Sequence, residues 1–168
     1  MQLNEPEKQQ AELEQAVSDV LAEARRRGAS AAEASAHRDR GLAATVRLGE
    51  VETIEHTNDN GLAISVYFGQ HKGSASTADL SRDAIRETVE AACNIARHTQ
   101  EDRFAGLADA DLIARDIPDL DLFHPWEVSV DEAVRAARRC EDAAREKDPR
   151  ICNSDGATVN SHSGIGVY

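Results

Sequence analysis

The sequence predicts an α+β protein, a two-layer sandwich in which helices pack on a mainly antiparallel sheet. Apolar and polar residues alternate through residues 42–48 and again through 62–68, which is the period of half-buried strands. Two other segments, around Leu13 and around Val89, carry apolar residues at intervals of three and four, the period of a helix face. The strands leave one apolar face open and each helix has one apolar stripe, so burying the stripes on the sheet satisfies both.

The first helix is predicted over residues 6–27. Pro6 is tolerated in a first helical turn, and Gly28 is a residue type that often ends helices. The apolar stripe of this helix consists of Leu13, Val17, Val20, Leu21 and Ala24. Alternating alanines at positions 32, 34 and 36 then predict a strand that leads into the one beginning at Leu42.

The central stretch, residues 42–81, predicts an antiparallel meander. Gly49 breaks the first alternating run, and the segment Asn58–Gly61 carries a strong turn signal before the second run. Residues 69–73 then turn the chain into a strand of small residues, 73–78. The meander has one apolar face that requires a cover.

The second helix is predicted to begin after Ser81, a favourable N-cap residue. Its apolar stripe consists of Ile85, Val89, Ala92, Cys93 and Ala96. We expect the stripes of both helices to pack on a single sheet face, formed by Leu42, Val46, Ile64 and Val66.

The chain changes character after His98. A short helix is predicted over residues 109–115. It is followed by an extended connector, Ile117–Trp126, which contains two prolines and whose large apolar side chains are expected to anchor it to the domain.

A third helix is predicted to open with the capping box of Ser129 and Glu132. Its apolar side carries Ala133, Ala137, Cys140 and Ala144. Strands are then predicted at 150–153 and 157–168, separated by a turn at Ser154–Gly156. These elements are expected to start a further sheet.

The predicted organisation has three parts. Residues 1–100 form an N-terminal α+β domain, and residues 101–128 form an acidic, proline-bounded connector. Residues 129–168 form a helix and strands that continue the same domain or lead into a C-terminal domain. The sequence stops inside a β pattern at Tyr168, which we interpret as the mark of a fragment of a longer protein.

Charge limits the partners that this chain can have. The 31 acidic and 19 basic residues give a net charge of -12, so nucleic acid and anionic membrane surfaces would be repelled. Residues 100–132 hold ten acidic and two basic residues. This segment is interpreted as a solvated linker, with a docking surface for a basic partner as the alternative.

The sequence also predicts a cytoplasmic protein. It contains no apolar run of membrane-spanning length and no export signal at the N-terminus. The three cysteines, Cys93, Cys140 and Cys152, are odd in number and lack CxxC spacing, which favours reduced thiols over a disulfide framework. Cys93 and Cys140 fall on apolar helix faces and are predicted to be small core residues.

No residue of the chain is predicted to be catalytic, cofactor-binding or metal-binding. The sequence lacks HExxH and HExxxH motifs, a GxSxG elbow and a P-loop. Residues 153–156 are compatible with a ligand-gathering loop, although a turn explains them without one. The six histidines show no metal-ligand spacing; they are His37, His56, His71, His98, His124 and His162.

Three separated segments nevertheless resemble one family. They read GEVETIEHTNDNGLAISVYFGQHKGSASTADLS, IPDLDLFHPWEVSVDEA and RICNSDGATVNSHSG, and begin at Gly49, Ile117 and Arg150. In this order and spacing they resemble the N-terminal domain of the TldD/PmbA family, more closely its PmbA (TldE) branch. The resemblance runs from about Gly41 to the end of the sequence.

The resemblance implies a subunit of a bacterial zinc metallopeptidase complex. In that family a TldD-type and a PmbA-type subunit form a heterodimer that cleaves small or unfolded peptides, including peptide antibiotics during maturation and antitoxins during turnover. The zinc motif belongs to the C-terminal domain of the TldD-type partner, so no zinc ligand is carried onto this chain, which is expected to be non-catalytic. Self-association of the chain is also expected. The alternative function is a stand-alone acidic protein-interaction module.

Overall fold

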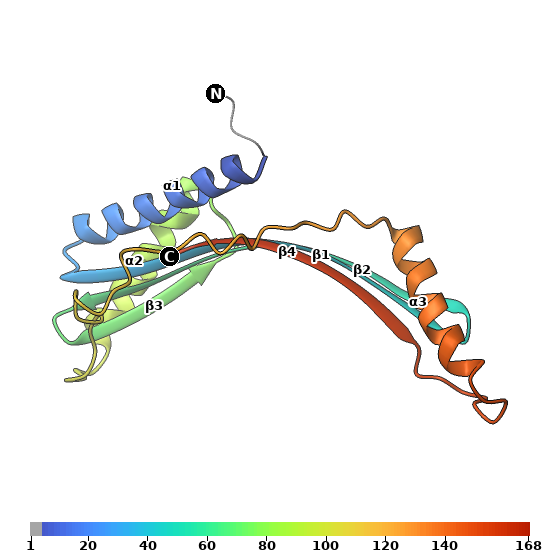
Figure 1. Ribbon diagram of the computed structural model, residues 1–168. Helices are drawn as coiled ribbons and strands as arrows, with labels where there is room; N and C mark the ends of the chain where they lie inside the picture. Colours follow the sequence, from blue (N-terminus) through green and yellow to red (C-terminus); the bar gives the residue numbers. More distant parts are fainter. Residues whose placement is uncertain (1–4) are drawn as a thin grey trace. The chain divides into compact units, whose positions relative to one another are not determined.

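The computed structural model describes residues 5–168 (Figure 1). Its elements, in chain order, are α1 Glu5–Arg26, β1 Ala31–Arg47, β2 Glu50–Phe68, β3 His71–Thr77, α2 Arg82–His98, α3 Val130–Arg145 and β4 Ala157–Val167. The strands form one sheet in the order β3-β2-β1-β4. The predicted α+β class is therefore confirmed. The last strand joins this sheet and does not start another.

The chain divides into two compact units, which we describe separately. Unit 1 comprises residues 5–38, 59–119 and 165–168, and unit 2 comprises residues 39–58 and 120–164. Strands β1 and β2 each contribute residues to both units. Along β4, the Thr158 hydroxyl lies 2.8 Å from the Thr45 hydroxyl of β1 within unit 2.

The core of unit 1 confirms most of the predicted helix-on-sheet packing. Leu13 of α1 and Val89 of α2 are fully buried in the same apolar cluster as Ile64 and Val66 of β2. The remaining buried members of that cluster are Ala16, Val17, Val20, Ala24, Ala36, Leu62, Ile85, Ala92, Cys93 and Ala96. Leu42 and Val46 were predicted to belong to this face, which is wrong, since they lie in unit 2.

Helix α2 approaches strand β3 very closely at Gly73. A Cβ atom at this position would overlap the carbonyl oxygen of Ala92 and the backbone nitrogen of Ala96, and would lie 2.9 Å from the Ala96 Cα. These are backbone atoms and cannot move aside like the end of a flexible side chain. Glycine therefore permits the contact between α2 and β3.

The turns of the sheet differ from the prediction. The predicted turn at Asn58–Gly61 is wrong, because β2 runs without interruption from Glu50 to Phe68. The chain reverses instead at Leu48 and Gly49, whose φ angles are 51° and 82°.

Neighbours on β1 explain the turn-type residues inside β2. Gly61 leaves room for the imidazole ring of His37, which a Cβ atom would overlap. The amide oxygen of Asn60 accepts a 3.0 Å hydrogen bond from Nε of Arg38. These residues therefore fit close strand pairing and not a turn.

The two helix starts that capping residues predict, after Ser81 and after Ser129, are confirmed. The side chain of Ser81 accepts a hydrogen bond from the Ala84 N–H at the start of α2. At the start of α3, Ser129 and Glu132 form the reciprocal capping box.

In unit 2, α3 contacts the tip of the β1–β2 hairpin (Figure 1). The Glu141 carboxylate accepts hydrogen bonds from the backbone N–H groups of Leu48, at 2.7 Å, and Gly49, at 2.8 Å. Arg138 donates from Nε to the Gly49 carbonyl at 3.0 Å. The buried apolar residues of this unit are Ala44, Val46, Ala133 and Ala137.

Two short predicted elements are absent from the described residues. Residues 109–115 form a turn closed by one 2.9 Å bond, from the Leu112 N–H to the Asp109 carbonyl, and not a helix. Residues 150–153 are not a strand. Asp148 accepts from both the backbone and the guanidinium of Arg150, which fixes a local turn where the strand was expected.

Several exposed side chains also differ from the prediction. Cys93 is buried as expected, but the prediction that Cys140 is a core residue is wrong, since Cys140 is exposed. The buried stripe of α3 is narrow and consists of Ala133, Ala137 and Glu141. The connector was expected to anchor its apolar groups, yet Ile117 and Leu122 are 81% and 82% exposed. No helix within residues 5–168 has the length and apolarity required to cross a membrane.

Candidate functional site

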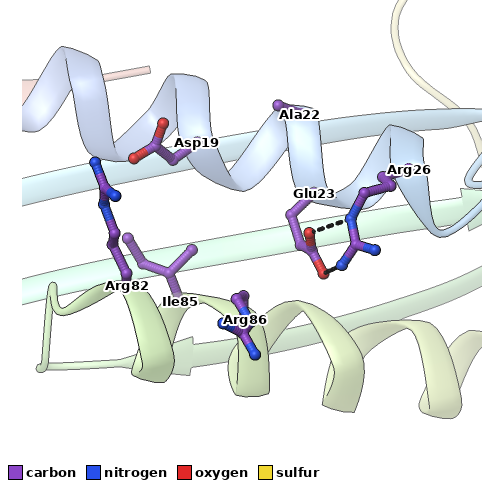
Figure 2. A pocket seen from close by; sticks show the side chains of 7 residues that line it. All are labelled: Asp19, Ala22, Glu23, Arg26, Arg82, Ile85 and Arg86. Atoms are coloured by element: carbon purple, nitrogen blue, oxygen red, sulfur yellow. Dashed lines mark hydrogen bonds and ion pairs between the residues drawn. The ribbon is translucent and has the colours of Figure 1, made fainter.

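A charged groove lies between α1 and α2 in unit 1 (Figure 2). Its volume is about 410 Å³. The lining residues are Asp19, Ala22, Glu23 and Arg26 from α1 and Arg82, Ile85 and Arg86 from α2. On each helix these positions recur at intervals of three and four, so they form the border of the buried apolar stripe.

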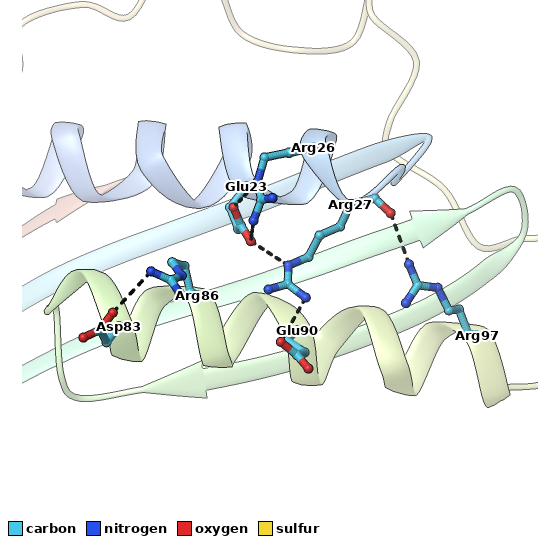
Figure 3. A network of polar contacts seen from close by, with 7 residues as sticks. All are labelled: Glu23, Arg26, Arg27, Asp83, Arg86, Glu90 and Arg97. Atoms are coloured by element: carbon cyan, nitrogen blue, oxygen red, sulfur yellow. Dashed lines mark hydrogen bonds and ion pairs between the residues drawn. The ribbon is translucent and has the colours of Figure 1, made fainter.

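An ion-pair network extends from one end of this groove (Figure 3). Glu23 lies at its centre, with carboxylate oxygens 2.6 Å from the guanidinium nitrogens of both Arg26 and Arg27. Arg27 continues to Glu90 of α2 at 3.1 Å. Arg97 donates a 3.1 Å hydrogen bond to the Arg27 carbonyl. The network therefore connects the end of α1 to the middle and end of α2.

The arginines hold Glu23 in its ionised form. The hydrogen bond from Arg26 is the main reason that the pKa of Glu23 falls to about 2; burial opposes the shift and Arg27 adds to it. The same bonds to Glu23 raise the pKa values of Arg26 and Arg27. Glu23 therefore stays charged at neutral pH and has little ability to act as a general base.

The groove can bind charged groups but lacks the parts of a catalytic centre. Its lining contains no serine, threonine, cysteine or histidine, so it offers no nucleophile paired with a base. Arg86 is already 3.4 Å from Asp83. The arrangement supports ionic contact with a ligand or a partner, and its strongest ion pairs stabilise the packing of the helices.

A second polar cluster lies across strands β1, β2 and β3. Tyr67 is only 3% exposed, and its hydroxyl donates a 2.8 Å hydrogen bond to Glu33. Lys72 Nζ is 3.5 Å from the Glu33 carboxylate and 5.4 Å from the centre of the Tyr67 ring. Burial, and then Glu33, raises the pKa of Tyr67, so the phenol remains a neutral donor. The cluster links three strands and supplies no ionised nucleophile.

A larger cavity of about 560 Å³ lies in the same unit. Its lining is mostly apolar and includes Leu107, Ala108 and Ile113 from the segment after α2. The polar side chains are Glu33, Ser35, Ser65 and Tyr168. These groups include no metal-ligand set and no histidine. The cavity therefore has room for a ligand, but its lining offers no catalytic group.

The structure keeps the histidines on separate elements. Three of them contact nearby backbone carbonyls: His71 contacts Thr99, and His98 and His124 contact residues three or four positions away. His162 lies 3.5 Å from Asp39. Among residues 5–168, no three His, Cys, Asp or Glu side chains come together in a way that could hold a metal ion.

The Ser154–Gly156 segment, predicted as a turn between two strands, precedes β4 but follows no strand, since residues 150–153 are not one. The Gly156 N–H donates a 2.8 Å hydrogen bond to the Ser154 hydroxyl, and Gly156 has a φ of 95°. The sequence pattern does not reveal the role of Glu141, which binds the hairpin tip. Its only signal was an acidic residue in line with the alanine stripe of α3.

Comparison with known proteins identifies two family domains in the chain. Residues 32–96 match the model for PmbA/TldA metallopeptidase domain 1. Residues 123–167 match the model for the PmbA/TldA metallopeptidase central domain. Together the two matches cover well over half of the chain and follow one another in order.

Two curated relatives match almost the entire chain. The metalloprotease PmbA homolog of Haemophilus influenzae is 51% identical over 160 residues, which is 95% of this chain and 35% of that protein. Metalloprotease PmbA of Escherichia coli O157:H7 is 47% identical over 166 residues, 99% of this chain and 37% of the relative. The chain thus spans about a third of the length of these relatives.

The fold is also found in a solved structure. The crystal structure of TldE from Thermococcus kodakarensis superimposes with a TM-score of 0.64 at 20% identity, over 90% of this chain and 37% of the other. At this identity the likeness concerns the fold alone. Two family domains in order, two curated relatives near 50% identity and a shared fold lead to one conclusion: the chain is a PmbA/TldE-type member of the PmbA/TldD metallopeptidase family.

Proposed function

We propose that this chain is the N-terminal, non-catalytic part of a PmbA/TldE-type subunit in a cytoplasmic peptidase complex. The observation that carries the proposal is the 51% identity to a metalloprotease PmbA homolog over 95% of the chain. In the complex, a TldD-type subunit supplies the zinc centre that hydrolyses the peptide bond. The substrates are small or unfolded peptides, including peptide antibiotic precursors and antitoxins.

The distribution of metal-binding side chains supports a non-catalytic role. The names of the relatives imply a metal, and a hydrolytic zinc site requires about three converging protein ligands. The described residues of this chain bring no such group together, and three of the histidines, His71, His98 and His124, contact backbone carbonyls. The residues therefore do not fit the metal, and no step of hydrolysis is assigned to them.

The test compares four samples: the purified chain, a TldD-type subunit, their mixture, and that mixture with a full-length PmbA-type subunit added as competitor. We expect the chain alone to contain no stoichiometric zinc by elemental analysis and to leave a fluorogenic peptide intact. We expect it to co-elute with the TldD-type subunit and to compete with a full-length PmbA-type subunit for that partner. One zinc per chain, or chelator-sensitive peptide turnover by the chain alone, would contradict the non-catalytic role.

A second candidate function is a stand-alone acidic interaction module. The connector favours it, because Ile117 and Leu122 are highly exposed among acidic neighbours, as binding segments often are. In the same experiment, this function predicts no co-elution and no competition. Loss of both signals in a folded sample would therefore exclude the subunit proposal and favour the module.

A further inference from the structure

Part of strand β2 forms an open edge of the sheet. The neighbour β3 pairs with β2 only from Leu62 to Phe68, opposite residues 77 to 71. Residues 50–58 of β2 lie beyond that register and belong to unit 2. On the side away from β1, no described strand therefore pairs with this segment. Within residues 5–168, the outward backbone N–H and C=O groups of this segment have no strand partner.

The same segment is exposed on both faces of the sheet. Every residue from 50 to 58 is exposed, including the apolar Val51 and Ile54 at 43% each. Val51, Thr53, Ile54 and Thr57 are residue types that favour strands. A second strand could therefore lie along this edge without moving any described element of unit 2.

The charge of the edge is negative. Glu50, Glu52 and Glu55 are all exposed, and only Glu52 has a cationic neighbour, Arg47 at 3.6 Å. Within residues 5–168, Glu50 and Glu55 form no ion pair. The opposite edge strand, β4, carries no Asp, Glu, Lys or Arg from Ala157 to Val167. The two edges thus offer the same backbone chemistry with different charge.

We propose that residues 50–58 bind an extended, basic peptide segment, which adds to the sheet as a strand beside β2. Backbone hydrogen bonds supply the attachment, and the two unpaired glutamates select lysine or arginine side chains. A second copy of this edge is disfavoured, because antiparallel pairing would bring like charges together. The binding requires neither a metal nor a second subunit, so it does not depend on the peptidase proposal.

The binding experiment uses the full chain and three labelled peptides. The first alternates lysine with valine and threonine, the second replaces lysine with glutamate, and the third carries N-methyl groups on alternate residues of the lysine peptide. We expect fluorescence anisotropy to show binding of the first peptide alone. Hydrogen exchange should slow at residues 50–58 when it binds and remain unchanged along β4.

Matched charge variants test the role of the glutamates. Glu50→Lys with Glu55→Lys should weaken binding of the lysine peptide about tenfold. Asp109→Lys with Asp111→Lys makes the same change in net charge at exposed positions of unit 1 and should leave binding unchanged. Equal loss in both variants would overturn the proposal, since attraction would then be non-specific.

Three further outcomes would also overturn it. Equal binding of the N-methylated peptide would exclude strand addition. Protection along β4 would assign the binding to the other edge. Protection of residues 50–58 that rises with chain concentration, without any peptide, would identify a second copy of the chain as the occupant.

Discussion

The carboxylate of Glu141 on α3 accepts a 2.7 Å hydrogen bond from the backbone N–H of Leu48, in the turn of the β1–β2 hairpin. Glu141 is only 2% exposed, yet it remains ionised because the turn supplies N–H donors. The hydrogen bond from the Gly49 N–H is the largest cause of its lowered pKa, and burial acts in the opposite direction. Glu141 thus attaches α3 to the hairpin, together with Arg138, which donates to the Gly49 carbonyl.

Removing the charge of Glu141 should loosen that attachment. In Glu141→Gln, one of the two carboxylate oxygens becomes an amide that cannot accept a hydrogen bond, so either Leu48 or Gly49 loses its acceptor. We expect faster hydrogen exchange at these two amides and a lower thermal midpoint. Glu146→Gln is the control, because Glu146 is an exposed residue at the C-cap of α3, and it should change neither the exchange nor the thermal midpoint. Unchanged exchange at Leu48 and Gly49 would show that the bonds contribute little.

The core of unit 1 should respond strongly to loss of volume at Val66. This side chain of β2 is fully buried in the apolar cluster that includes residues of α1 and α2. Val66→Ala should therefore lower the free energy of unfolding by about 1 to 4 kcal/mol. Val51→Ala removes the same atoms at an exposed site of β2 and should cost less than about 0.5 kcal/mol. Urea midpoints measure both. Equal midpoints would contradict the burial of Val66.

A methyl group at position 73 should separate α2 from β3. Gly73→Ala places a Cβ against backbone atoms of Ala92 and Ala96, and we expect a loss of about 3 kcal/mol in the free energy of unfolding. Gly106→Ala is the control, because nothing lies within 4 Å of the added atom. Urea denaturation of the two variants provides the comparison, and a tolerated Gly73→Ala would refute the close contact.

The Glu23 network should make stability depend on pH in the acid range. The pKa of Glu23 is about 2 in the folded chain against a usual value of 4.5, so the unfolded chain takes up a proton first as the pH falls. The contribution of ionised Glu23 to the free energy of unfolding is complete above about pH 4.5. It is lost as the pH falls from 4.5 to about 2.

Substitution of Glu23 isolates this contribution. Glu23→Gln should lower the free energy of unfolding at pH 6 by about 1 kcal/mol, after allowance for solvent screening, and should reduce its dependence on pH below 4.5. Glu14→Gln on the same helix is the control, since Glu14 hydrogen-bonds only to Gln10 among the described residues. Identical acid profiles for both variants would contradict the role of the network.

Local sequence signals predicted the elements whose contacts are also local. The stripe around Leu13, the alternation before Phe68 and the capping box of Ser129 each need only a few neighbouring residues, and all three are found in the structure. The turn signal at Asn58–Gly61 failed because strand pairing with β1 overrides local preference.

Features that depend on distant residues were not predictable in the same way. Glu141 resembles any acidic residue of an amphipathic helix until the hairpin tip lies beside it. The ion pair of Arg27 with Glu90 likewise joins two helices that no local pattern connects. The extent of the open β2 edge depends on where β3 stops pairing, which is a property of the assembled sheet.

The position of β4 beside β1 has a consequence for the order of folding. Thr45 and Thr158 contact each other although 113 residues separate them, so this strand pairing requires closure of a long loop. The contact of β3 with α2 instead lies within residues 71–98 and can form early. During synthesis from the N-terminus, β3 and α2 can therefore meet while the β4 side of β1 is still bare. We expect a fast kinetic phase for this local contact and a slower one for the arrival of β4.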